Sequence, residues 1–225
     1  MAKAAAKKKP AAPRKPAARK APAKPASRPR KPRGGIIGDL LGLRAGFRPS
    51  FQAMLARGIG EERMFAYLAI SCFVAFLAGL PQAIDMAANM PQEDALVGLV
   101  AGRFVAWLIF GSLFMYGLAA ASHAIAFWGF RGKGTYAGAR LALFWALFLA
   151  IPLGILSAAL TQVLQLLGLT GLTDSFGILI FFFWLWLWTG FFAIAEGFPR
   201  GSVFLVALAV CACLTGFVWL LNAAT

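Results

Sequence analysis

Five apolar runs follow one another along the chain from residue 65 onward, separated by short loops that carry charges or glycine. A helix needs about 20 mostly apolar residues to cross a hydrocarbon layer about 30 Å thick, because every backbone amide must be bonded within the segment. Each run reaches roughly that length. The pattern predicts an all-α, polytopic membrane protein, a bundle of five transmembrane helices at residues 65–84, 104–127, 141–167, 176–195 and 203–221.

Two of these runs carry a feature that modifies a simple crossing. The second apolar run covers residues 96–130, which is too long for one straight crossing, so the predicted span is limited to residues 104–127. Arg103 is expected to extend its side chain from the end of this span to the water interface. Pro152 lies inside the third run and predicts a kink, because proline cannot donate the backbone hydrogen bond that a helix interior requires.

A different pattern precedes the first run, at residues 34–64. Phe51, Met54 and Leu55 follow the i, i+3, i+4 spacing that places side chains on one helix face. Ser50 follows a proline and is a predicted N-cap, since its hydroxyl can accept a backbone hydrogen bond there. The segment is predicted to form one or two short helices. Two placements remain open, an interfacial amphipathic segment on the membrane and a cytosolic helical pair packed on the ends of the bundle.

Residues 1–33 have a composition of their own, thirteen Lys or Arg residues mixed with alanine and proline and no acidic residue. The whole chain holds 22 basic and 8 acidic residues, so this segment accounts for nearly all of the net charge of +14. It cannot bury apolar area and its prolines interrupt helices, which predicts a disordered basic tail.

Three roles are open for the basic tail. It can bind anionic lipid head groups, bind nucleic acid through counterion release without reading its sequence, or serve only to fix the topology. The residues expected to contact lipid or an acidic partner, two of them in a later loop, are Lys7, Lys8, Lys9, Arg14, Lys15, Arg19, Lys20, Arg131 and Lys133.

The charges of the loops alternate along the chain. Arg131, Lys133 and Arg140 lie in the second loop, whereas Asp85 and Asp94 lie in the first. Loops rich in Lys and Arg stay on the cytoplasmic side of a membrane. Together with the basic tail, this alternation predicts a cytoplasmic N-terminus and, after five crossings, a periplasmic C-terminus.

Residues able to do chemistry are few in the apolar body. The three cysteines lie inside apolar runs and are interpreted as small packing residues. His123, the only histidine, and Glu196 lie near the ends of the second and fourth spans on the same predicted side, and they form a candidate polar pair in the bundle. We therefore predict no catalytic, cofactor-binding or metal-binding residues and no enzymatic activity.

Three segments resemble bacterial members of the Yip (Ypt-interacting protein) family. They are residues 60–80 (GEERMFAYLAISCFVAFLAGL), the end of the second span (LAAASHAIAFWGF) and residues 131–152 (RGKGTYAGARLALFWALFLAIP). In that family a short basic, glycine-rich turn, followed by Thr or Ser and an aromatic residue, leads into the third of five spans. The resemblance implies a five-span integral membrane protein with a cytosolic N-terminus. Eukaryotic relatives bind Rab-type GTPases and act in vesicle traffic, but no functional residue carries over to this chain.

These features together predict a non-enzymatic, Yip-like protein of the bacterial inner membrane with a scaffolding or membrane-organising role. The expected partners are membrane lipids, mainly anionic head groups, with a protein partner or a second copy of the chain as further candidates. One alternative is a small-solute transporter, which would use the Pro152 kink with His123, Glu196, Gln162 and Gln165. The other is a membrane tether for nucleic acid, which would use the tail.

Overall fold

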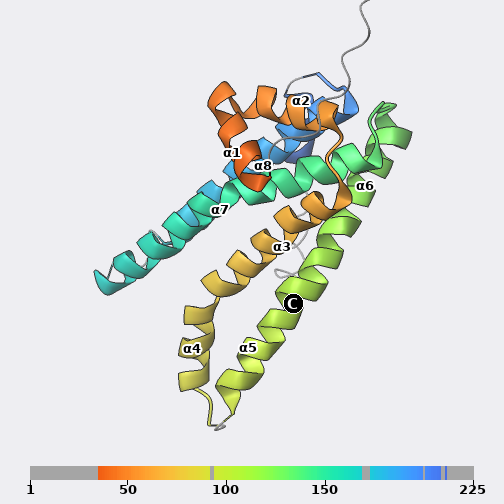
Figure 1. Cartoon of the computed structure of the whole chain (residues 1–225). Helices are drawn as coiled ribbons and strands as arrows, with labels where there is room; N and C mark the ends of the chain where they lie inside the picture. The colour runs from red at the N-terminus through yellow and green to blue at the C-terminus, as the bar shows by residue number, and fades with distance from the viewer. Residues whose placement is uncertain (1–34, 92–93, 169–172, 200, 209–210, 212–225) are drawn as a thin grey trace, which may run out of the picture. The chain divides into compact units, whose positions relative to one another are not determined.

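The computed structural model describes residues 35–91, 94–168, 173–199, 201–208 and 211, and the secondary structure of this part of the chain is helical without a strand. The basic tail predicted at residues 1–33 lies outside the described residues. Figure 1 shows the arrangement of the helices. In chain order they are α1 (Ile36–Gly42), the 3-10 turn η1 (Leu43–Ala45), α2 (Phe47–Arg57), α3 (Glu61–Ala78), α4 (Leu80–Ala88), α5 (Ala95–Val105), the π-helical segment η2 (Ala106–Gly111), α6 (Ser112–Phe130), α7 (Tyr136–Leu166) and α8 (Thr173–Glu196).

Within the described residues, four helical segments are long enough and apolar enough to cross a membrane. They correspond to the first four predicted spans, and the first three begin before the predicted residue. Of the fifth predicted span, residues 203–208 are helical, and most of the remainder lies outside the described residues. The chain is therefore an all-helical protein with membrane-spanning character. The four segments are Glu61–Ala88, Ala95–Phe130, Tyr136–Leu164 and Phe176–Glu196.

The first two segments form a long helical hairpin, with α4 packed on α5 and α3 packed on η2 and α6. Gly79 separates α3 from α4, and Arg103 of α5 crosses to this break, where it donates to the Gly79 carbonyl oxygen at 2.5 Å and to Gln82 Oε1 at 3.0 Å. Arg103, whose side chain is expected to extend toward the interface, thus also links the two arms of the hairpin. Residues 95–130 form one helical run with a π-helical segment inside it, about 54 Å long at 1.5 Å per residue, so the helix must tilt or protrude from the hydrocarbon layer.

The helices α1 and α2 pack on the bundle. Phe51 of α2 is fully buried and stacks on Phe191 of α8, with 4.7 Å between the ring centroids. The prediction that Ser50 caps α2 is wrong. The helix begins at Phe47, and the Ser50 N–H already bonds to the Gly46 carbonyl oxygen at 3.2 Å inside the first turns. A proline is tolerated in the first turn because the amides there have no intrahelical acceptor to lose.

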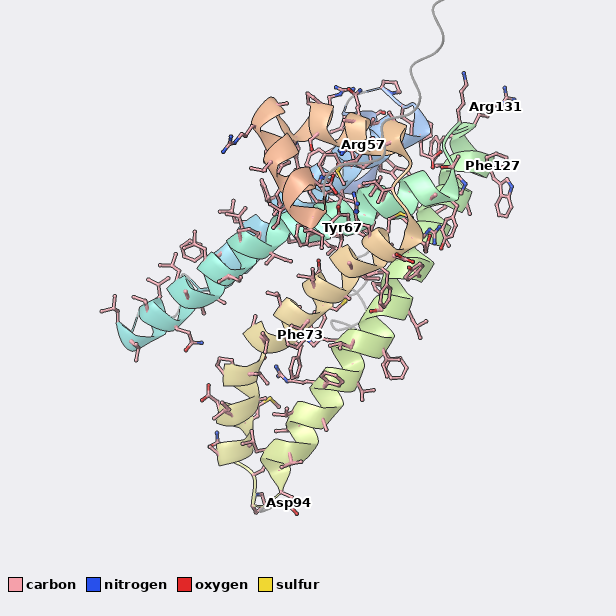
Figure 2. All side chains as sticks on the ribbon, viewed as in Figure 1. Arg57, Tyr67, Phe73, Asp94, Phe127 and Arg131 are labelled. Atoms are coloured by element: carbon pink, nitrogen blue, oxygen red, sulfur yellow. The ribbon has the colours of Figure 1, made fainter. Side chains whose placement is uncertain are left out.

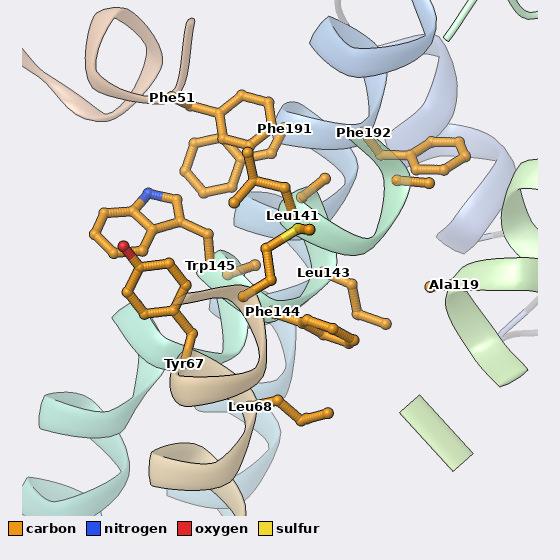
Figure 3. Packing of buried hydrophobic residues seen from close by; sticks show 14 of the residues in the cluster. Phe51, Tyr67, Leu68, Ala119, Leu141, Leu143, Phe144, Trp145, Phe191 and Phe192 are labelled. Atoms are coloured by element: carbon orange, nitrogen blue, oxygen red, sulfur yellow. The ribbon is translucent and has the colours of Figure 1, made fainter. Parts of the chain in front are cut away.

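The apolar core surrounds the first half of α7. Phe144 and Trp145 are fully buried, and the rings of Tyr67 and Trp145 lie 5.0 Å apart between their centroids (Figure 3). The helix α7 continues through Pro152, and beyond it large side chains such as Leu156 and Val163 are exposed. Apolar side chains exposed over a whole helix face favour contact with lipid rather than water.

Candidate functional site

Most of the charged side chains of the described helices gather where α2, the turn between α6 and α7 and the last turns of α8 meet. Figure 2 shows Arg57 and Arg131 toward this end of the molecule and Asp94 at the tip of the hairpin, far from it. Three clusters of ion pairs and hydrogen bonds occupy this region. We call it the ionic end, and its paired residues are Asp39, Arg57, Glu61, Arg63, His123, Arg140 and Glu196.

The first cluster is centred on Asp39 of α1, whose side chain is fully buried. Tyr67 donates its hydroxyl to Asp39 Oδ2 at 2.6 Å, and Arg63 Nη1 lies 3.2 Å from the same oxygen. Arg57 Nη2 lies 3.3 Å from Asp39 Oδ1. Two positive charges and a hydroxyl offset the cost of removing this carboxylate from water. The cluster ties α1 to α2 and α3.

The sequence-based reasoning missed this cluster. The signal available for it was a lone acid, Asp39, within the apolar stretch of α1 and ahead of several arginines. A buried carboxylate needs partners, so an acid among apolar residues in a basic segment is a reason to look for an ion pair.

The second cluster joins α3, α6 and α7 through Glu61. Its Oε1 accepts a hydrogen bond from the Tyr116 hydroxyl at 3.2 Å and pairs with Arg140 Nη1. The Arg140 guanidinium lies over the Tyr136 ring, 4.5 Å from its centroid, which adds a cation–π contact. Arg140, interpreted from the sequence only as a topology signal, therefore holds three helices together.

The third cluster contains the predicted polar pair. His123 Nδ1 of α6 lies 2.6 Å from Glu196 Oε1 at the end of α8, within hydrogen-bond distance, and the Glu196 side chain is buried. The Gly134 N–H donates to Glu196 Oε2 at 3.0 Å, and the Lys133 N–H donates to the Glu196 carbonyl oxygen at 3.1 Å. The structure thus brings His123 and Glu196 together and adds the glycine-rich turn as a third partner.

The glycines of this turn are required by its close approach to α8. A Cβ atom at Gly132 would lie 2.5 Å from Glu196 Oε2, and one at Gly134 would lie 2.5 Å from the Ala195 carbonyl oxygen. Arg131 ends α6 in the left-handed region, with φ of 55°, and the Gly132 N–H bonds back to the Ala126 carbonyl oxygen at 2.8 Å. This reversal, typical of helix C-termini, directs the chain onto Glu196.

The other sequence-predicted contact residues are placed as follows. Arg131 and Lys133 lie on the turn with exposed side chains, and within the described part of the chain neither forms an ion pair. Gln162 is exposed on α7 and does not belong to the three clusters. The seven predicted contact residues of the tail, from Lys7 to Lys20, lie outside the described residues.

The arrangement is suited to holding helices together. Each buried or half-buried carboxylate of the ionic end accepts from partners on at least two other elements. Among the residues that the structure describes, no three His, Cys, Asp or Glu side chains come together as a metal site would require. Comparison with known proteins adds no family: no family model, curated protein or solved structure matches this chain.

Proposed function

We propose that this chain is a non-enzymatic, Yip-like integral membrane protein of the bacterial inner membrane that acts as a scaffold or membrane organiser. Its N-terminus is cytoplasmic and its C-terminus periplasmic, and its tail binds anionic lipid or an acidic partner. The observation that carries the proposal is the use of the bundle's buried charges. Among the described residues, the buried carboxylates Asp39 and Glu196 are paired with basic side chains, a tyrosine hydroxyl and a backbone N–H.

The cavities of the described helices support a scaffold over a transporter. A cavity of about 440 Å³ is lined by residues of α6, α8 and the segment 198–211, and its lining hydroxyls on α6 and α8 donate to carbonyl oxygens of their own helices. Ser122 donates to Leu118 at 2.6 Å, and Thr189 donates to Leu185 at 2.7 Å. In the crevice between α3, α7 and α8, Ser71 donates to Tyr67 at 2.7 Å in the same way. A polar solute would find mainly apolar walls there.

The tail and the turn supply the surface that is proposed to bind lipid. Arg131 and Lys133 are exposed at the ionic end, and the positive-inside rule places such a loop on the cytoplasmic side, together with the tail. Each Lys or Arg near an anionic membrane contributes about 1 kcal/mol before screening by salt. Thirteen such residues in 33 make electrostatic capture of an anionic surface the expected activity of the tail.

The test uses the full-length protein in nanodiscs of neutral lipid, to which vesicles of phosphatidylglycerol or phosphatidylcholine are added. We expect capture of the anionic vesicles at low salt and its loss at about 0.5 M salt, where the Debye length falls to a few ångströms. Replacing Lys7, Lys8, Lys9, Arg14, Lys15, Arg19 and Lys20 by Gln should abolish most of the capture. The matched control exchanges Lys and Arg at the same positions and should bind normally. Salt-insensitive capture, or equal capture by the Gln variant, would contradict the lipid role.

The two alternatives have their own readouts. A transporter predicts solute flux into proteoliposomes that Glu196→Gln reduces, whereas the scaffold predicts no flux to lose. A nucleic-acid tether predicts that the protein binds duplex DNA with a steep salt dependence and no sequence preference. Duplex binding stronger than vesicle capture at the same salt would favour the tether.

A further inference from the structure

A groove of about 280 Å³ lies between the first turn of α2, the C-terminal half of α8 and residues 201–204, beside the point where Phe51 packs on Phe191. Its walls are mainly apolar and include Phe47 of α2, Trp186 and Phe191 of α8, and Phe204. Trp186 precedes Glu196 by ten residues, so the α8 wall extends about 15 Å from the ionic end at 1.5 Å per residue. The groove therefore reaches from the layer of charged residues into the apolar part of the bundle.

Among the described residues, the cation that lines this apolar groove is Arg48 of α2, which is partly buried. The arginines Arg57, Arg63 and Arg140 of the ionic end each pair with a carboxylate. Arg48 differs, because no carboxylate in the described ranges lies within ion-pair distance of it. A guanidinium next to apolar walls is complementary to a ligand that has both an anionic group and an apolar part.

We propose that this groove binds an anionic phospholipid, with its phosphate on the Arg48 guanidinium and one acyl chain along Trp186 and Phe191. A guanidinium can donate two parallel hydrogen bonds to phosphate oxygens, which makes arginine well suited to this head group. The length and apolar character of the α8 wall match an acyl chain that enters from the head-group layer. The site uses no residue of the tail, so it is a second lipid contact, distinct from the electrostatic capture proposed above.

Two substitutions test the two halves of the site separately. Arg48→Gln removes the charge but keeps a polar side chain that can donate a hydrogen bond. Gly190→Leu fills the groove, because Gly190 lines it and a Cβ added there would meet no atom within 4 Å, so the helix accepts the larger side chain. The matched controls are Arg44→Gln, an exposed arginine that does not line the groove, and Gly117→Leu, an open helical glycine on α6.

The measurement is native mass spectrometry of the full-length protein in detergent, titrated with phosphatidylglycerol or phosphatidylcholine at about 0.5 M ammonium acetate, where binding by the tail is screened. We expect one retained phosphatidylglycerol and weaker binding of phosphatidylcholine. Arg48→Gln should weaken the retained lipid about tenfold, as for the loss of a charge-assisted hydrogen bond, and Gly190→Leu should weaken it at least as much. Both control variants should bind as the wild type does.

Equal binding of the two lipids would overturn the proposal, and so would unchanged lipid binding by Arg48→Gln or Gly190→Leu. Full displacement of the lipid by inorganic phosphate, with Gly190→Leu unaffected, would indicate that the site binds a free anion instead of a lipid. Lipid binding by the tail is tested independently of lipid binding in the groove. If the seven-residue Gln variant of the tail loses vesicle capture and still retains one phosphatidylglycerol, both proposals hold. If the retained lipid disappears at high salt in the wild type, only the tail binding remains.

Discussion

Asp39 is the residue at which one carboxylate organises the segment ahead of the first span. It is fully buried, and it holds Arg57 of α2 together with Arg63 and Tyr67 of α3. Without the carboxylate, two guanidinium groups would remain beside each other with no counter-charge. The free-energy cost of removing the carboxylate therefore comes mainly from the two arginines, which stay partly buried without a counter-charge.

We predict that Asp39→Asn destabilises the full-length protein by about 3 kcal/mol, at the low end for a broken buried ion pair, because the arginine side chains are 37 % and 26 % exposed and water screens them. The measurement is the thermal unfolding midpoint in detergent. Asp85→Asn is the matched control, since Asp85 is exposed and forms no ion pair within the described helices. An Asp39→Asn midpoint equal to that of Asp85→Asn would show that the ion pairs do not stabilise α1.

Gly134 is a second residue on which local packing depends, in this case through its backbone. Its N–H binds Glu196 Oε2, and an added Cβ would lie 2.5 Å from the Ala195 carbonyl oxygen, a backbone atom that cannot move cheaply. We predict that Gly134→Ala costs about 1–3 kcal/mol, the range for overpacking. The same melting measurement should show Gly129→Ala unchanged or slightly stabilised, because that glycine lies in α6 with open space around it. Equal melting of the two variants would contradict the close approach of the turn.

At the scale of elements, hydropathy predicts which segments become membrane helices but not where they end. The first apolar run was expected at residues 65–84, whereas the helical segment covers Glu61–Ala88. Glu61 and Glu62 occupy the first turn of α3, where acidic side chains interact favourably with the helix dipole. A charged residue lowers the mean hydropathy of a segment but does not end a helix. Hydropathy therefore could not predict that the first helix begins at Glu61.

The contacts between elements were predictable to different degrees. His123 and Glu196 could be paired from the sequence, because both lie near the ends of apolar runs on the same predicted side of the membrane. The Asp39 cluster depends on the fold of α1 and α2 back onto α3, and no spacing along the chain reports that fold. The backbone contacts of the glycine-rich turn could not be predicted from the sequence either, because they require α8 to end beside the turn.

The hairpin of α3, α4 and α5 carries a prediction of its own. Arg103 satisfies the Gly79 carbonyl oxygen at the break between α3 and α4 and also binds Gln82. Removing it with Arg103→Leu should cost about 1.5–3 kcal/mol of local stability, the range for hydrogen bonds from a charged group. In hydrogen exchange, amides of residues 80–88 should then exchange about ten- to a hundredfold faster, whereas those of α7 should not change. Arg131→Gln, at an exposed position in the turn, is the control. Uniformly faster exchange in all helices would point to global destabilisation instead of local opening.

At the scale of the whole molecule, polar and apolar contacts are distributed unequally. The fully buried aromatic residues pack around Tyr67, Phe144 and Trp145 (Figure 3), and Tyr67 also binds Asp39 in the first cluster of the ionic end. Toward the other end the helices expose large apolar side chains, and the window that defines the second spanning segment has none of its residues buried. In water such surfaces would aggregate, whereas lipid covers them without cost. These exposed apolar faces are of the kind that a surrounding bilayer would cover.

The same distribution leads to a prediction about topology. If the ionic end faces the cytoplasm, as the basic loop implies, the hairpin tip at Asp94 faces the periplasm. Single cysteines at Lys133, Asp94 and Thr225, in a chain whose three native cysteines are replaced by alanine, report the side of each position. A membrane-impermeant maleimide applied to intact cells should label Asp94→Cys and leave Lys133→Cys unlabelled until the membrane is opened.

The label at Thr225→Cys decides the number of crossings. Five crossings place this residue on the same side as Asp94, because each crossing changes the side and the chain starts in the cytoplasm. Four crossings place it with Lys133 instead. Labelling of Thr225→Cys only after lysis would therefore reduce the number of crossings to the four segments of the described helices. Labelling of Lys133→Cys in intact cells would show the opposite orientation and remove the basis for a cytoplasmic, lipid-binding tail.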